Sequence, residues 1–580
     1  MGKRSGAVHV ARVVRKYKDR EYVSFLLRRS YRDAGKVKHE TLANLSALPA
    51  HAIAALRSSL AGRRLVDAEE AFQVTRSLPH GHVAAVWAMA RKLGFPALLG
   101  PAGPERDLAM ALVIARVVEP DSKLATTRWW PDTTLGADLG VATATTDQVY
   151  AAMDWLRARQ DRIERTLAGW HLAPGGLVYY DLSSSWVEGQ HCPLAARGYS
   201  RDRKRGKAQI EYGLVTDPGG RPVAVEVFPG NTGDPATVPG QVQKLRDRFG
   251  IQRVVMVGDR GMLTAARIEA LRELGGVGWI TTLRAPAIAA LAQAGTIQPS
   301  LFDQTNLAEV THPDYPGERL VVCRNPLLGA ERARKRTELL DATSAELDKV
   351  VRAVEAGKLH GAATIGVRVG RVLGRFKMAK HLTLDITDTS FGYARNQPTI
   401  DAEAALDGIY VVRASVAASE LDAAGLVDAY KRLSNVERDF RSLKTVDLEL
   451  RPIHHHLEQR VRAHVLVCML AAYLVWHLRK AWAPLTFTDE APPERTDPIA
   501  PAERSQTAQL KASRRQLADG TTAHSFHTLL QHLATLTRDD LTFTDPTHGT
   551  RTQIQKLTSP TPTQRKAFEL IQAVIPLTLT

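Results

Sequence analysis

Cysteine is scarce in this chain of 580 residues, which contains only Cys192, Cys323 and Cys468. The three lie far apart and are odd in number, so they define neither a disulfide framework nor the paired spacing of a cysteine-bound metal site. Reduced thiols are typical of proteins in a reducing compartment. The scarcity therefore argues against the class of small disulfide-rich secreted proteins.

Long hydrophobic runs are also missing. The longest apolar stretch, Val465 to Trp476, has about twelve residues, whereas a helix needs about 20 to cross a bilayer. The first residues, Met-Gly-Lys-Arg-Ser, are basic and lead into no apolar signal segment. We therefore expect a soluble cytoplasmic protein that binds no membrane.

Negative charge is in deficit. The chain has 77 Lys and Arg against 61 Asp and Glu, a net charge of +16 and a pI near 9.7. Residues 1–40 carry twelve basic against four acidic side chains, and residues 319–380 carry fourteen against six. Such an excess favours a polyanionic partner, and these two segments are candidate phosphate-contacting surfaces.

Three acidic residues carry the most specific chemical signal. Asp181 ends the apolar run Gly-Leu-Val-Tyr-Tyr-Asp, and Asp259 ends the run Arg-Val-Val-Met-Val-Gly-Asp. Carboxylates at the carboxyl ends of buried strands lie where open α/β sheets bind ligands, and Glu437 in a helical run can add a third. Such a set is typical of a site for Mg²⁺ or Mn²⁺. Two such ions polarise a phosphodiester and activate water or a 3′-hydroxyl for in-line displacement.

The segment around Glu437 has a regular spacing. Tyr430, Glu437 and Lys444 are seven residues apart, which on a single α-helix places them on one face at intervals of about 10.5 Å. An acid between an aromatic hydroxyl and a cation suits a metal site beside a nucleic-acid backbone. The alternative is an ordinary amphipathic helix, whose core-facing stripe would be Leu433, Val436, Phe440 and Leu443.

Further acids compete for these roles. Glu188 and Glu211 do not end an apolar strand, and Asp439 faces about 160° away from Glu437 on a helix. The sequence therefore favours Asp181, Asp259 and Glu437.

With these motifs the chain resembles the DDE transposases of bacterial insertion sequences, in the branch with a Tyr-x2-Arg-x3-Glu-x6-Lys signature. Tyr430, Glu437 and Lys444 match the signature, whereas Leu433 occupies its arginine position. The resemblance is close over residues 175–285 and 405–480 and looser in the N-terminal part. It extends through the blocks Asp181-Leu-Ser-Ser-Ser-Trp-Val-Glu188-Gly, Gly198-Tyr-Ser-Arg-Asp-Arg, Val227-Phe-Pro-Gly-Asn231-Thr-Gly-Asp234 and Gly258-Asp259-Arg-Gly261.

The resemblance implies a transposase that binds the terminal inverted repeats of its own element as double-stranded DNA, then cleaves and transfers strands into target DNA. Such a protein would be associated with the nucleoid. Asp181, Asp259 and Glu437 would be both the catalytic residues and the ligands of two Mg²⁺ or Mn²⁺ ions, in a synaptic homodimer. The residues expected to contact DNA are Tyr430, Lys444, Arg441, Arg201, Arg203 and Lys204. Two alternatives stay open, namely a transposase-derived DNA-binding protein without strand transfer and a metal nuclease that only hydrolyses DNA.

Leu433 raises the question of what replaces the signature arginine. Arg441 lies one turn after Glu437, and we expect it to supply the missing phosphate contact, with Arg432 as the other candidate. On this hypothesis Leu433→Arg changes strand transfer little.

The order of the expected elements indicates an α/β fold. Three strands, a helix, a strand, a helix and a strand over residues 176–283 are the order of a ribonuclease H-like catalytic core, completed by an acidic helix at about 426–444. A β-containing insertion would interrupt this core. The predicted regions are an N-terminal DNA-binding region at 1–170, the first part of the core at 171–285, the insertion at 286–404, the second part of the core at 405–482, and a linker with a helical C-terminal region at 483–580.

Overall fold

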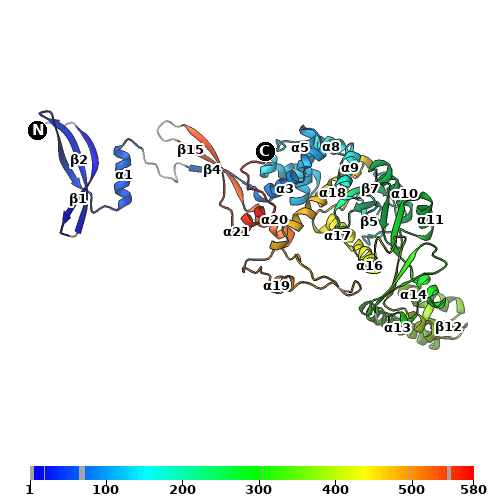
Figure 1. Ribbon diagram of the computed structural model, residues 1–580. Coiled ribbons are helices and arrows are strands. Elements are labelled where there is room, and N and C mark those ends of the chain that lie inside the picture. The colour runs from blue at the N-terminus through cyan, green and yellow to red at the C-terminus, as the bar shows by residue number, and fades with distance from the viewer. Residues whose placement is uncertain are drawn as a thin grey trace. The chain divides into compact units, whose positions relative to one another are not determined.

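The computed structural model of the protein describes residues 6–18, 20–63, 72–302, 305–495, 497–544 and 550–579. It divides into two compact units (Figure 1), one made of residues 1–78 and 537–558 and the other of residues 79–536 and 559–580. The boundary differs from the one predicted at residue 170. The helices between residues 81 and 171, which lie in the predicted DNA-binding region, belong to the larger unit because their apolar faces form part of its core.

The smaller unit contains two three-stranded sheets. The basic N-terminal segment forms the antiparallel sheet β1-β2-β3, with a turn at Ala34 and Gly35, both at positive φ. The second sheet has the order β16-β15-β4. It pairs a strand from the N-terminal part of the sequence with two strands from the C-terminal part, and it was not predicted. The elements of this unit are β1 (Ala7–Tyr17), β2 (Arg20–Asp33), β3 (Lys36–Asn44), α1 (Ala50–Leu60), β4 (Phe72–Pro79), β15 (Thr537–Thr544) and β16 (Arg551–Leu557).

The larger unit begins with a group of helices that pack around α18 (Glu458–Ala481). Residues 108–118 of α5 are all buried, and α5 lies against both α8 and α18. These helices are α3 (Gly81–Lys92), α4 (Phe95–Leu99), α5 (Pro104–Val118), α6 (Lys123–Trp129), α7 (Thr134–Asp138), α8 (Thr146–Arg157) and α9 (Gln160–His171), with a 3-10 turn at Trp130–Asp132.

An eight-stranded mixed sheet forms the centre of this unit, in the order β10-β11-β14-β9-β8-β5-β6-β7. Strands β5, β8 and β9 are parallel, whereas β6 and β7 continue antiparallel from β5, and β14, β11 and β10 continue antiparallel from β9. The strands are β5 (Leu177–Trp186), β6 (Gln209–Thr216), β7 (Pro222–Pro229), β8 (Val254–Val257), β9 (Val277–Thr282), β10 (Leu307–Val310), β11 (Arg319–Arg324) and β14 (Ile409–Ala414).

The predicted insertion is only partly separate from this sheet. Strands β10 and β11 extend the central sheet, whereas the residues from α13 to α15 have a small apolar cluster of their own.

The helices between the strands of the central sheet are α10 (Asp234–Gln243), a π-helical turn (Lys244–Arg248), α11 (Ala265–Leu274) and α12 (Ala285–Gln293) with a 3-10 turn (Pro299–Phe302). The subdomain consists of α13 (Pro326–Glu355), α14 (Ala362–Phe376), a 3-10 turn (Ala379–His381), β12 (Leu382–Ile386), β13 (Phe391–Arg395) and α15 (Gln397–Ala404).

The segment predicted as one helix over 426–444 is broken. It consists of α16 (Ala423–Lys431), α17 (Leu433–Arg441) and a π-helical turn (Ser442–Val446). The seven-residue spacing of Tyr430, Glu437 and Lys444 therefore does not lie on a single regular helix. The remaining elements are α18 (Glu458–Ala481), a 3-10 turn (Ala483–Leu485), α19 (Gln506–Arg514), α20 (Phe526–Ala534) and α21 (Pro562–Leu570).

Helix α18 is the core helix of the larger unit. By length and composition alone it could cross a membrane, with a mean hydropathy of 1.6 in its most apolar window, but 83% of that window is buried inside the protein. It packs against α5 and α8 and also against the edge strand β7.

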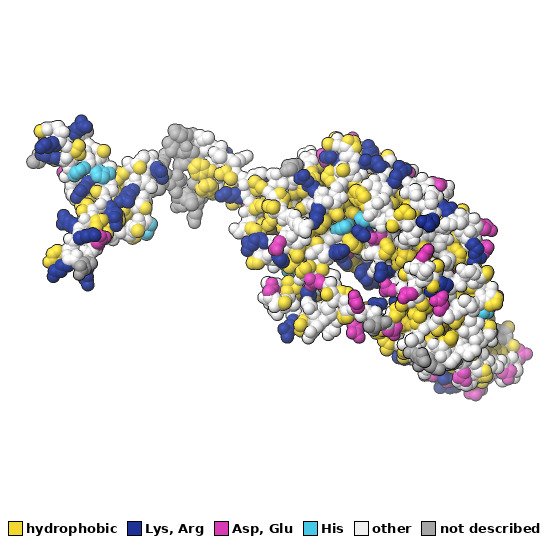
Figure 2. Space-filling view, in the orientation of Figure 1, with side chains coloured by type: hydrophobic (Ala, Val, Ile, Leu, Met, Phe, Trp, Pro, Cys, Tyr) yellow, Lys and Arg dark blue, Asp and Glu magenta, His cyan; other side chains and the backbone are white. Residues whose placement is uncertain are grey.

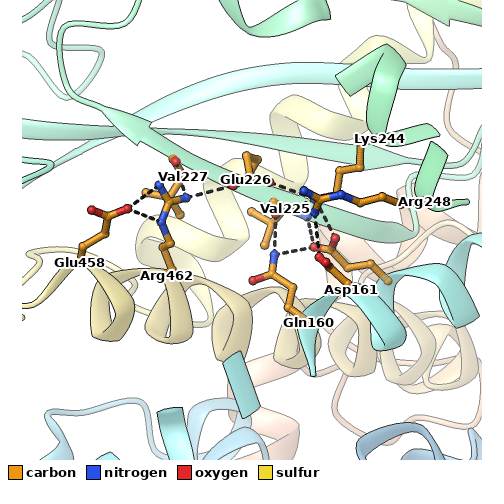
Figure 3. A network of polar contacts seen from close by, with 10 residues as sticks. Gln160, Asp161, Val225, Glu226, Val227, Lys244, Arg248, Glu458 and Arg462 are labelled. Atoms are coloured by element: carbon orange, nitrogen blue, oxygen red, sulfur yellow. Dashed lines mark hydrogen bonds and ion pairs between the residues drawn. The ribbon is translucent and has the colours of Figure 1, made fainter. Parts of the chain in front are cut away.

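Buried ion pairs hold β7 between α9, α18 and the π-helical turn after α10 (Figure 3). The Lys244 ammonium lies 2.7 Å from the Glu164 carboxylate and 3.2 Å from that of Glu226, and Arg462 also contacts Glu226 at 3.0 Å. Burial raises the pKa of Glu164, and the Lys244 charge opposes that rise. The network holds β7 in place at one edge of the central sheet. The candidate site lies on the same sheet.

Candidate active site

Asp181 and Asp259 come from neighbouring parallel strands. Tyr179 of β5 pairs with Val257 of β8, and the two aspartates come two residues later on each segment. The two segments therefore bring Asp181 and Asp259 to neighbouring positions, and both side chains line one cavity. Asp259 follows the end of β8 as predicted, whereas Asp181 lies in the middle of β5 and not at the end of a strand.

The two aspartates differ in how the backbone supports them. The Asp259 carboxylate accepts hydrogen bonds from the backbone N–H groups of Gly261 at 3.0 Å and Met262 at 2.7 Å. Asp181 accepts one such bond, from Leu182 at 2.8 Å. Burial raises the pKa of Asp181 to about 7, the Leu182 bond opposes the rise, and the negative charge of Asp259 adds to it.

Glu437 completes this acidic group from α17. Its side chain is exposed, and within the described part of the chain it has no hydrogen-bond or ion-pair partner. Its charge also raises the pKa of Asp181, after the effects of burial and of Asp259. The opposite side of α17 is the predicted core-facing stripe, which is confirmed by the burial of Leu433, Val436, Phe440 and Leu443.

The burial of Leu433 corrects one expectation. Only 6% of this side chain is exposed, and it packs in the main core. Leu433→Arg would therefore bury a charge without a partner, so the expectation that this substitution changes little is wrong.

A cavity of about 890 Å³ brings the three acids together with other polar residues. Most of its lining comes from β5, the loop 197–202, the loop 230–234 and the segment 437–445. The residues that line it are Asp181, Leu182, Ser183, Arg197, Gly198, Tyr199, Arg201, Asp202, Glu211, Gly230, Asn231, Thr232, Gly233, Asp234, Asp259, Glu437, Phe440, Arg441, Lys444, Thr445 and Arg451.

Two glycines let the cavity loops approach each other closely. A Cβ atom on Gly198 would lie 2.1 Å from the Gly230 carbonyl oxygen, and one on Gly230 would lie 1.9 Å from that of Gln209. The Gln209 side chain amide donates to the carbonyls of Gly230 and Tyr199, which ties the two loops together. The sequence blocks around these glycines thus form a fixed wall of the cavity.

Arg201 is paired with acids inside the cavity. Its guanidinium donates to the carboxylates of Glu211 and Asp234, the latter at 2.6 Å. Burial raises the pKa of Glu211 to about 7, and the Arg201 charge opposes the rise. This pairing favours a structural role for Arg201, and its contact with DNA stays a prediction.

Lys444 is also engaged within the protein. Its ammonium donates to Asp202 at 2.9 Å, and Arg451 donates to the same carboxylate, whose side chain is 2% exposed. Burial lowers the pKa of Lys444, and the bond to Asp202 opposes that effect. Lys444 therefore lines the cavity in contact with a partner that the sequence did not indicate, and its contact with DNA stays a prediction.

Tyr430 lies beside the acidic group and not in the cavity lining. Its hydroxyl accepts a hydrogen bond from Thr282 at 3.1 Å. Burial raises its pKa, and the charges of Asp259 and Glu437 contribute to the rise.

Other basic residues at the site are exposed. Arg441 and Arg197 line the cavity and have no ion pair within the described residues, while Arg203 and Lys204 lie in the neighbouring exposed loop. Lys204 also stacks over the Trp186 ring at 4.9 Å. Arg441 is thus the predicted DNA contact that is best placed to reach a phosphate in the cavity.

The competing acids are arranged differently from the predicted three. Glu188 is bound by Lys207 at 2.8 Å outside the cavity, and Asp439 is directed toward the turn at Gly220. Glu211 does line the cavity, but in its pair with Arg201. Glu211, Asp202 and Asp234 are site residues to which sequence reasoning gave no role, although two of them lie in the blocks that carry the resemblance.

The acidic group fits divalent ions by its donor chemistry. All three groups are carboxylates, which Mg²⁺ and Mn²⁺ prefer, and a cation would relieve the repulsion that contributes to the raised pKa of Asp181. In the described residues no group of three His, Cys, Asp or Glu side chains is close enough to hold one ion. Binding of one ion by all three acids would therefore require their side chains to move closer together.

Comparison with known proteins identifies the family. Residues 10–71 match the N-terminal domain of the IS1634 family transposases, and residues 183–474 match the transposase DDE domain. The second match spans half of the chain, and the chain therefore belongs to the DDE transposases of insertion sequences.

Structural similarity to a solved transposase complex is weak. A piggyBac transposase synaptic complex with hairpin DNA has 9% sequence identity and a TM-score of 0.34, and the similarity covers 78% of this chain and 76% of that one. A comparison with curated proteins gives no match.

Proposed function

We propose that this transposase binds the terminal inverted repeats of its own element and performs metal-dependent strand cleavage and strand transfer, as a homodimer in the synaptic complex. The observation that carries the proposal is that Asp181, Asp259 and Glu437 line one cavity and are electrostatically coupled there. They are also the only acids among the cavity residues for which no cationic partner occurs in the described chain.

We further propose that the catalytic core is ribonuclease H-like. The strand order β7-β6-β5-β8-β9 supports this assignment, because three antiparallel strands are followed by two that run parallel to β5. The order of strands and helices along the chain is the predicted one, and α17 supplies the third acid.

On this proposal, the charged residues named below have distinct roles in the cavity. Asp181, Asp259 and Glu437 would hold two Mg²⁺ or Mn²⁺ ions, which when bound would polarise the phosphodiester. Asp181 would exchange its proton for a cation, because its pKa of about 7 lies close to neutral pH. Arg441 and Arg197 would hold phosphates of the DNA, while the pairs of Arg201 and Lys444 with buried acids fix the cavity walls.

The test is an assay of the purified protein with DNA duplexes that carry the two flanks of its gene. Binding, nicking and joining are scored separately with Mg²⁺, with Mn²⁺ and with a chelator. We expect metal-dependent nicking at the element boundary, followed by joining to target DNA. Asp181→Asn, which keeps the shape of the side chain but removes its charge, is the matched inactive control.

The same assay separates the alternatives. Binding without nicking would favour a transposase-derived DNA-binding protein, and nicking without joining would favour a metal nuclease. Either outcome with an intact, folded protein contradicts the proposed strand transfer.

A further inference from the structure

The sheet β1-β2-β3 of the smaller unit has two faces with different charge. Pairing registers assign each residue to a face, since directly paired residues share a face and successive residues alternate. The face that carries Phe25 also carries Arg12, Lys16, Arg29, Lys36 and Lys38. The opposite face carries His9, Arg15, Arg20, Arg28, Arg32 and His39.

The acids of the sheet all lie on the first of these faces. They form cross-strand ion pairs there, between Lys16 and Glu21 at 3.0 Å, Arg29 and Glu40 at 3.4 Å, and Lys38 and Asp33 at 2.6 Å. Helix α1 packs on the same side, with the Arg57 guanidinium 5.4 Å from the centre of the Phe25 ring. We call it the helix face.

The other face, which we call the open face, has four arginines and no acid among the described residues of the three strands. Arg15, Arg20 and Arg32 are exposed and have no ion pair in that part of the chain, and the Arg28 Nε atom has no hydrogen-bond partner. Figure 2 shows histidine side chains grouped with basic ones on this unit.

Hydrogen-bonding groups occupy the centre of the open face. The Ser30 hydroxyl bonds to the His39 ring at 2.9 Å and lies 3.5 Å from that of His9. Arg28 pairs with His9 on one side and with Thr41 on the other, so it stands in the middle of this polar group. Groups of these kinds contact base edges in specific complexes.

The dimensions of the sheet suit the major groove. Three strands span about 10 Å between the outer two, and the major groove of B-DNA is about 12 Å wide. Arg20 and Arg32 are twelve residues apart on β2, which is about 40 Å along the strand. The central residues can therefore reach bases while the outer arginines reach phosphates on both sides of the groove.

We propose that the open face of β1-β2-β3 enters the major groove of the element ends, with Arg28 contacting bases and with Arg15, Arg20 and Arg32 contacting phosphates. This inference rests on the proposed function, and it names the surface by which the transposase distinguishes its own ends. The absence of acids on this face is what selects a polyanion, and the central polar group is what allows sequence to be read.

The first test uses the unmodified full chain on a duplex of the gene flank. Methylation of guanine N7, which lies in the major groove, should interfere with binding at a few positions, whereas a minor-groove ligand should compete weakly. Protection confined to the minor groove, or equal affinity for the flank and for a scrambled duplex, would overturn the proposal.

The second test uses variants of the two faces. Arg28→Ala should weaken binding to the flank by roughly 5- to 150-fold and leave binding to the scrambled duplex almost unchanged. The triple variant Arg15→Ala, Arg20→Ala, Arg32→Ala should weaken binding to both duplexes and make the slope of log affinity against log salt less steep by about 3.

The helix face supplies the matched control. Arg12→Ala with Lys36→Ala removes two exposed basic side chains from the same sheet, and it should not change the preference for the flank. Thermal melting of each variant confirms folding. A loss of preference in this control equal to that of Arg28→Ala would contradict the assignment of the face.

The outcome also separates this proposal from the proposed function. If the full chain cleaves its ends but Arg28→Ala keeps full preference for them, the open face is not the reading surface and the transposase function stands. If the unmodified chain neither prefers nor cleaves its ends, both proposals fail.

Discussion

The cavity of the larger unit contains three acids without an ion-pair partner among the described residues, whereas one face of the sheet in the smaller unit carries arginines and no acid. In the cavity Arg201 and Lys444 are paired with acids, and the unpaired groups include the carboxylates of Asp181, Asp259 and Glu437. On the sheet the acids are paired on the helix face, which also carries Arg12 and Lys36 without an ion pair among the described residues, whereas the open face carries arginines and no acid.

The difference shows which ligand each region suits. Proteins pair most charges that they bring together, so a cluster of one sign without partners needs a partner from outside. The cavity suits cations next to a phosphodiester, and the open face suits a polyanion. One chain can thus hold the metal ions and the DNA on separate surfaces, and each surface can be disabled without the other.

The largest effect is expected from the unpaired acids. Asp181→Asn, Asp259→Asn and Glu437→Gln should each reduce cleavage on the order of 10³-fold or more, with end binding largely intact. Each substitution keeps the shape of the side chain and removes the charge that would bind metal under the proposed function. Cleavage rates and binding to the gene flank are measured on the same preparations. If a variant keeps more than a tenth of the cleavage rate, the substituted residue is not one of the catalytic acids.

Double variants sharpen this prediction. If the three acids act as a unit, as the proposed function requires, any two substitutions together should be scarcely worse than one. Additive losses would show that the acids act independently.

The acids could be found from sequence because apolar runs mark strands. Asp259 follows β8 as expected, and β5, β6 and β7 precede the first helix of the core in the predicted order. The end of β5 could not be predicted, since the strand continues through Ser183, Ser184 and Ser185, polar residues that are buried by later contacts. The Ser184 hydroxyl, for example, accepts a hydrogen bond from the Arg201 backbone.

Partners distant in sequence account for most of what was missed. Strand β11 enters the central sheet by pairing with β14, about 90 residues later, and no local pattern specifies such a pairing. In the same way, Asp202 and Lys444 are distant in sequence, and only the folded chain brings them together as an ion pair. The sequence could predict which residue types line the candidate site. It could not predict which of the charged residues form ion pairs with one another.

The buried network at β7 offers the next largest effect. Lys244→Met leaves Glu164 without its cation in a fully buried position, which should lower the free energy of unfolding by about 3–5 kcal/mol. Chemical denaturation measures the change. Arg248→Met removes the exposed pair with Asp161 in the same network and, as a control, should change stability by less than about 1 kcal/mol.

Equal effects of Lys244→Met and Arg248→Met would show that burial does not distinguish the two pairs. The comparison between paired and unpaired charge would then lose its energetic basis.

A smaller effect is expected at the cavity rim. Arg441→Ala should reduce strand transfer about tenfold, since an Arg–phosphate bond contributes about 1.5–3 kcal/mol and solvent weakens it at an exposed site. Arg438→Ala on the same helix is the control, because Arg438 is exposed but does not line the cavity. Equal losses in the two variants would mean that only the overall charge of α17 matters.

The smallest effect concerns the proton on Asp181. Its pKa is raised to about 7 in the folded protein, so the folded state holds this proton between about pH 4 and 7 while the unfolded state releases it. Stability from this group is therefore lost as the pH rises through 7. Without metal ions, Asp181→Asn should melt higher than the unmodified protein at pH 8, on the order of 1–3 °C, and the difference should shrink at pH 5.

Mg²⁺ should then raise the melting temperature of the unmodified protein more than that of Asp181→Asn, because binding to the folded state stabilises it. Glu188→Gln lies outside the cavity and should respond to Mg²⁺ as the unmodified protein does. If Asp181→Asn and the unmodified protein melt alike at both pH values, Asp181 is not held protonated by burial and by its acidic neighbours, and the cavity does not favour a cation in the way proposed.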